Sequence, residues 1–168
     1  MKQWVITASH AVDAVIKRIA MVVLLALVAV VLLQVLARYV LFQPPVWTEE
    51  LSRYLMIWAG LLGATLAFKR AFDPTLFPAR SIGGLGPWLR SIAVLLWVLP
   101  ALFYSLFGPG MRWHRGYLMR HAHTYSETMD FPTLVVAAAV PIALLIILLH
   151  LAARWAGDSA AAGEGEHA

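Results

Sequence analysis

The residues best suited to carry chemistry form one run, residues 47–54 (WTEELSRY). Glu49 lies four residues and Glu50 three residues before Arg53. Both spacings bring side chains together on a helix surface, and an acid that precedes its base is the order that the helix dipole favours. The run therefore predicts ion pairs within one helix.

Arg38 places a second cation near this run. It follows Gln34 by one turn, close to the end of the preceding apolar stretch. An antiparallel hairpin would bring Arg38 to the level of Glu49 and Glu50, which predicts an ionic clasp that fixes the hairpin. A docking surface for a partner subunit and an ion pathway are the alternatives.

Metal and haem chemistry have less support. His121 and His123 are metal-capable, with two carboxylates nearby, but their spacing matches no zinc pattern. A solvated basic loop is the favoured interpretation. His150 is the only histidine inside an apolar stretch, whereas haem held between helices prefers a pair.

Enzyme chemistry is not expected either. The sequence contains no cysteine and no hydrolase-type arrangement of serine and histidine. The glycines of residues 83–86 follow no predicted strand and lack the lysine of a P-loop. We therefore predict a protein that is not an enzyme and has no catalytic residue, no metal site and no cofactor of its own.

The elements that position these residues are apolar blocks. Of the 168 residues, 61% are hydrophobic and 13% charged, and the blocks have the roughly 20-residue length that a bilayer requires. The sequence thus predicts an all-α membrane protein with four transmembrane helices. A single domain over residues 1–156 is expected, followed by a disordered tail over 157–168; the predicted spans are about residues 19–42, 49–70, 88–107 and 131–153.

The N-terminal segment, residues 1–18, spaces its apolar residues as one face of a helix. An interfacial N-terminal helix and a simple extension of the first span are both consistent with this spacing. A signal peptide is a further alternative, but the apolar run that follows is long for one, and three more spans come after it.

The stretch 49–70 is unusual among the spans, because its uncharged part, residues 54–68, covers only about 22 Å as a helix and is shorter than the hydrocarbon layer. Glu49, Glu50 and Arg53 must then lie at the membrane boundary, where a charge needs a partner. Small residues recur on this stretch and would allow another helix to approach closely. They are Ala59, Gly60, Gly63, Ala64 and Ala67.

The net charge of +4 comes from basic residues at the ends of apolar blocks, which indicates topology and excludes nucleic-acid binding. Four spans place both termini on one side, and that side carries eight of the 13 basic residues. The termini are therefore predicted to be cytoplasmic. The spans hold few polar groups and no internal repeat, so an accessory subunit is expected instead of a complete transporter.

Two segments resemble a known family, the DctQ-like small membrane subunits of tripartite ATP-independent periplasmic (TRAP) transporters. The first is residues 46–70, where the run 47–54 is followed by Trp58, residues 62–64 (LGA), Ala67 and residues 69–70 (KR). The second is residues 126–142, with Ser126, Pro132 and Pro141. The sequence differs from the family pattern at residues 71–76 and at residues 108–110, where Gly-Pro-Gly interrupts the third apolar block.

The resemblance implies a scaffold subunit in the bacterial cell inner membrane. Its partners would be a large multi-span permease, a periplasmic solute-binding protein and membrane lipid. Sodium ions and the transported organic acid would bind in those partners. The expected structural or partner-contact residues are Arg38, Trp47, Glu49, Glu50, Arg53, Tyr54, Trp58, Gly60 and Gly63. The alternative is a membrane anchor of another complex that uses residues 112–130 as its interaction surface.

Overall fold

The computed structural model describes residues 2–70, 86–108 and 110–157. Its helices are α1 (Lys2–Tyr39), α2 (Val46–Lys69), α3 (Gly86–Leu106), the 3₁₀ helix η2 (Trp113–Arg115), α4 (Tyr117–Ala122), α5 (Leu134–Ala137) and α6 (Ala139–Trp155). Four stretches are long and apolar enough to cross a membrane, with α5 and α6 together forming the fourth. The predicted fold class is therefore confirmed.

The first helix is one uninterrupted rod. α1 contains neither glycine nor proline, so nothing in its 38 residues stops the helix before Tyr39. Its length of ~57 Å exceeds the ~30 Å hydrocarbon layer. The N-terminal segment is thus an extension of the first span instead of a separate interfacial helix.

α2 begins three residues before the predicted span of 49–70. The helix begins at Val46, directly after Pro45, whose extended backbone is the N-cap. Thr48, a residue type that often caps helices, lies inside the first turn and donates a hydrogen bond back to the Pro45 carbonyl at 2.7 Å. This bond explains how a fully buried threonine hydroxyl is satisfied at the helix start.

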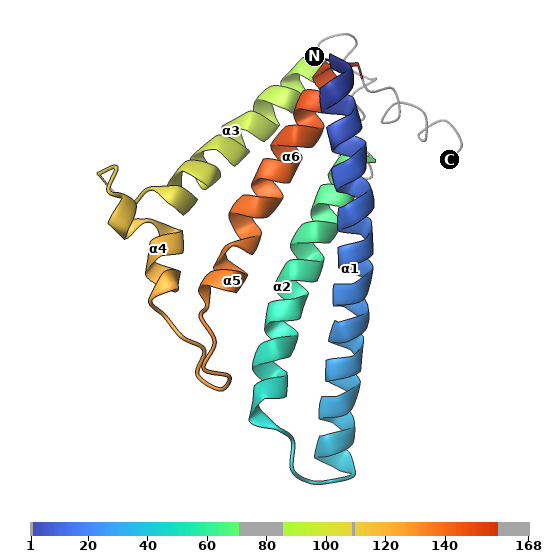
Figure 1. Ribbon diagram of the computed structural model, residues 1–168, viewed down its shortest axis with the longest axis vertical. Coiled ribbons are helices and arrows are strands. Elements are labelled where there is room, and N and C mark those ends of the chain that lie inside the picture. Colours follow the sequence, from blue (N-terminus) through green and yellow to red (C-terminus); the bar gives the residue numbers. More distant parts are fainter. Residues whose placement is uncertain (1, 71–85, 109, 158–168) are drawn as a thin grey trace.

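The long helices pack as a hairpin with two further helices beside it. α1 and α2 lie side by side, α6 packs against both of them, and α3 packs against α6. α1, α3 and α6 come together at the end that holds the N-terminus, and α3 diverges from the hairpin toward the opposite end (Figure 1). Residues 71–85, between the second and third spans, and the predicted tail from residue 158 lie outside the described residues.

A group of polar side chains joins three helices at the N-terminal end; we name Ser9, His10, Asp13, Lys69 and His150 the terminal cluster. The Lys69 ammonium is almost buried and donates to the Ser9 carbonyl at 3.3 Å and to His10 Nδ1 at 3.2 Å. It also lies 3.6 Å from Asp13. Ser9 is hydrogen-bonded to His150 Nδ1 at 2.9 Å, which ties α6 to the α1–α2 pair.

The end of α6 adds two further connections. Arg154 donates to the Phe68 carbonyl at 2.9 Å, and its guanidinium lies 5.0 Å from the Phe68 ring centroid. This carbonyl is one of the four at the end of α2 that have no partner within the helix. Trp155 donates from its indole nitrogen to Ser91 at 3.0 Å and packs edge-on against Trp88. α3 is thereby held to the same end of the bundle.

Small side chains form much of the contact between helices. Alanine predominates among the most buried apolar residues, at positions 37, 137, 139, 143 and 153. Large apolar side chains such as Leu25 and Leu96 are mostly exposed instead. Soluble proteins show the opposite pattern, with large apolar side chains inside. In a membrane protein exposed leucines are expected, because lipid is as apolar as leucine and helices associate through close packing of small residues.

Replacing Lys69 should destabilise the bundle, since the substitution leaves the Asp13 carboxylate without its cation. We expect Lys69→Ala to lower the free energy of unfolding by about 2 kcal/mol, measured by thermal denaturation in mild detergent. The neighbouring Arg70 is exposed, so Arg70→Ala is the matched control and should leave the stability unchanged. Equal effects of the two variants would contradict a structural role for the terminal cluster.

Candidate functional site

The site at the start of α2 is centred on the carboxylate of Glu50, a residue that is only 7% exposed. The Tyr54 hydroxyl, one turn later on α2, donates to one carboxylate oxygen. The backbone nitrogen of Thr128 donates to the other oxygen at 3.1 Å, and the Thr128 hydroxyl donates to the same oxygen. We name Glu50, Tyr54 and Thr128 the Glu50 site. It satisfies a buried carboxylate with neutral donors alone.

The loop that supplies Thr128 is held by its own hydrogen bonds. The Ser126 nitrogen donates to the Phe131 carbonyl at 2.8 Å, and the Met129 nitrogen donates to the Ser126 hydroxyl at 3.1 Å. Asp130 adopts a positive φ of 49°, which tightens the turn between them. The turn holds the Thr128 donors against α2, although Thr128 lies in neither a helix nor a strand.

The ion pairs predicted for this region are not found in the part of the chain that the structure describes. Glu49, Arg53 and Arg38 are exposed there, and none of them makes an ion pair. The ~100° turn between successive residues of a helix places Glu50 on a different face from Glu49. Glu50 faces the 124–133 loop, where hydrogen bonds replace the expected ionic clasp, while Glu49 and Arg53 face outward.

The other predicted contact residues fall mainly on the outward side as well. Trp47 is partly exposed and Trp58 is half-buried. Gly60 and Gly63 are exposed, and a methyl group added to either would meet no atom within 4 Å. The inner packing of α2 comes from a different set of buried residues, Leu62, Thr65 and Phe68. The face that sequence predicted for close packing is therefore unused inside this chain.

Sequence reasoning did not find Thr128, the residue that completes the Glu50 site. Thr128 lies 78 residues from Glu50 in the chain, so no local spacing rule connects them. Ser126 was noticed only through the family resemblance. One signal was available in the sequence. A carboxylate at a membrane boundary requires hydrogen-bond donors, and the polar segment between the third and fourth spans, residues 108–133, which we name the third loop, is a source of them.

His121 and His123, the candidate metal ligands, take part in contacts within the third loop or lie at its surface. His121 Nδ1 is hydrogen-bonded to the Thr133 hydroxyl at 3.0 Å, and its ring packs edge-on against Tyr117. His123 is the exposed C-cap of α4. No group of three or more metal-binding side chains occurs among the residues described.

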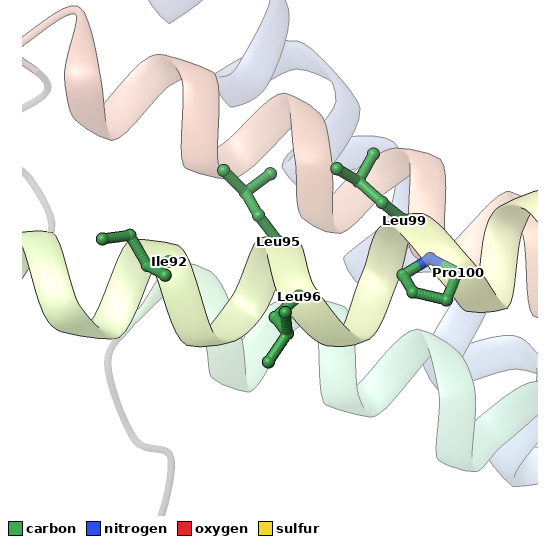
Figure 2. A pocket seen from close by; sticks show the side chains of 5 residues that line it. All are labelled: Ile92, Leu95, Leu96, Leu99 and Pro100. Carbon is green, nitrogen blue, oxygen red and sulfur yellow. The ribbon is translucent and has the colours of Figure 1, made fainter.

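An apolar groove lies on α3. It is lined by Ile92, Leu95, Leu96, Leu99 and Pro100, and Leu95 and Leu99 point toward α6 (Figure 2). None of these side chains can hydrogen-bond or carry charge, so the groove suits hydrocarbon and not an organic acid.

The buried polar side chains of the described residues lie toward the ends of the helices, and those between the ends bond to their own backbone. Thr65, for example, donates to the Leu62 carbonyl at 2.7 Å. The middle of the bundle is consequently apolar and offers a charged solute no polar path. Fold and site together define a membrane protein with four candidate spans, in which polar contacts join α1, α2 and α6 at one end and α2 to the 124–133 loop at the other.

Comparison with known families assigns this membrane protein to one of them. The chain matches the family of tripartite ATP-independent periplasmic transporters, DctQ component, over residues 27–161. It belongs to this family, and the resemblance drawn from residues 46–70 and 126–142 is confirmed. The family consists of transporter components, not enzymes. Neither the curated proteins nor the solved structures gave a match.

The Glu50 site predicts a difference between two adjacent carboxylates. Glu50→Ala leaves the Tyr54 and Thr128 donors without their acceptor and should lower the free energy of unfolding by about 1–3 kcal/mol. Glu49→Ala, on the exposed face, should change it by less than about 0.5 kcal/mol. Thermal denaturation in detergent measures both. Faster proteolysis within residues 124–133 of Glu50→Ala alone would show that the loop has been released, and identical digestion of the two variants would contradict the site.

Proposed function

We propose that this chain is the scaffold subunit of a TRAP transporter, bound to a large multi-span permease in the bacterial inner membrane. The observation that carries the proposal is membership of the DctQ family over residues 27–161. The apolar middle of the bundle supports it, because substrate and sodium must then bind elsewhere. The permease would transport an organic acid coupled to sodium, and a periplasmic solute-binding protein would deliver that acid.

The arrangement of polar contacts suits a static support. The terminal cluster fastens α1, α2 and α6 at one end, and the Glu50 site fastens α2 to the third loop at the other. α2 is fixed at both ends and therefore resists sliding, since each movement would break buried hydrogen bonds. A rigid subunit of this kind can hold a moving permease at a constant position in the membrane.

Association with the permease is directly testable. When the chain is expressed from its native operon and purified through a tag in mild detergent, we expect a large permease with about a dozen spans to be recovered with it. Deletion of the chain should abolish uptake of the organic acid. Recovery without a permease would overturn the proposal, and recovery of a different membrane complex would favour the anchor alternative.

The predicted orientation gives a second test. Because the chain contains no cysteine, single cysteines report their own location. Gln3→Cys should react with a membrane-impermeant maleimide only after cells are opened, and His123→Cys should react in intact spheroplasts. Both positions are exposed. The opposite pattern would contradict cytoplasmic termini.

A further inference from the structure

The outward side of α2 is the most unusual surface of the described chain. Seven of the exposed residues of α2 share one face of the helix, from its first turn to its middle and beyond. They are Glu49, Arg53, Met56, Ile57, Gly60, Gly63 and Ala64. We name this set the α2 outer face. The α2 outer face carries charged residues near the start of the helix and small residues further along. No described helix or loop covers either part.

Arg53 is the first argument that this face has a partner. It lies ~10 Å along α2 from the helix start, on a helix that is long enough to cross the bilayer. Its side chain is exposed, and no ion pair joins it to another described residue. A charge at the membrane boundary is costly without a partner, and charged groups in such positions generally face a protein partner of opposite charge.

The two glycines provide a second, independent argument. Glycine costs about 1 kcal/mol relative to alanine inside a helix. Gly60 and Gly63 gain no packing within the chain, since an added Cβ would meet nothing within 4 Å. Lipid chains do not require a bare backbone, whereas a second helix does if it is to approach closely.

We propose that the α2 outer face docks one transmembrane helix of the large permease, which places a carboxylate opposite Arg53 and its backbone close to Gly60 and Gly63. This inference rests on the proposed function and specifies the surface through which that function is exercised. Charge complementarity selects an acidic partner helix over lipid. The close backbone approach selects a helix over a soluble domain, because Gly60 and Gly63 lie further into the membrane than Arg53.

The test uses variants that this chain should tolerate. Gly60→Leu and Gly63→Leu add side chains into open space, so the yield and thermal stability of the chain alone should not fall. We expect each to reduce the amount of permease recovered with the tagged chain about tenfold, and Arg53→Gln to do the same by leaving the partner carboxylate unpaired. Ala29→Leu, on the exposed surface of α1, is the matched control and should recover the wild-type amount.

The outcomes separate the two proposals. If the wild-type chain recovers no permease, the proposed function fails. If the wild-type chain recovers it and the glycine and arginine variants do so equally well, only the docking surface is overturned. An equal loss in Ala29→Leu would also overturn the assignment to α2.

Crosslinking identifies the occupant. Gly63→Cys, labelled with a thiol-reactive benzophenone and irradiated in membranes, should form an adduct of the chain with the permease. An adduct of two copies of this chain, or crosslinking to lipid alone, would overturn the inference.

Discussion

Hydrocarbon offers no hydrogen-bond partner, and this constraint accounts for the placement of the buried polar side chains in the described structure. Buried polar side chains either bond to their own helix, as Thr65 does, or gather at the helix ends. At one end Lys69 is surrounded by acceptors from α1, and at the other Glu50 is surrounded by donors from α2 and the third loop. Between these two ends the helices associate through close packing, which the small side chains of the buried alanines allow.

The same constraint distinguishes two faces of α2, one that packs inside this chain and one that is exposed. Glu50 and Tyr54 face the protein and are satisfied within it. Glu49, Arg53, Gly60 and Gly63 face outward and gain nothing from their own chain. A stand-alone membrane protein would be expected to present large apolar residues there. An outward face of charges and glycines is understandable if the chain completes its packing with another subunit, as membership of a multi-component transporter family implies.

Much of the fold was accessible from the length and order of the apolar blocks. A stretch such as residues 19–37 can be little else than a membrane helix, because its length matches the hydrocarbon layer and no charge interrupts it. Boundaries were less accessible. α2 begins three residues earlier than the predicted span, because Pro45 supplies a cap that needs no side chain, and the fourth block divides into α5 and α6 around Ala138.

By itself the sequence determined the class of molecule, the number of membrane helices, the family, and the importance of residues 47–54. These follow from local properties: hydropathy, block length and a short motif. Only the tertiary structure decided the partners of each charge. Glu50 bonds to Thr128 and not to Arg53, and Lys69 bonds to Ser9 and His10, because side chains 59 to 78 residues apart meet only after the helices pack. Because successive residues of a helix are rotated by ~100°, the adjacent glutamates lie on different faces: Glu50 is buried against the protein and Glu49 is exposed.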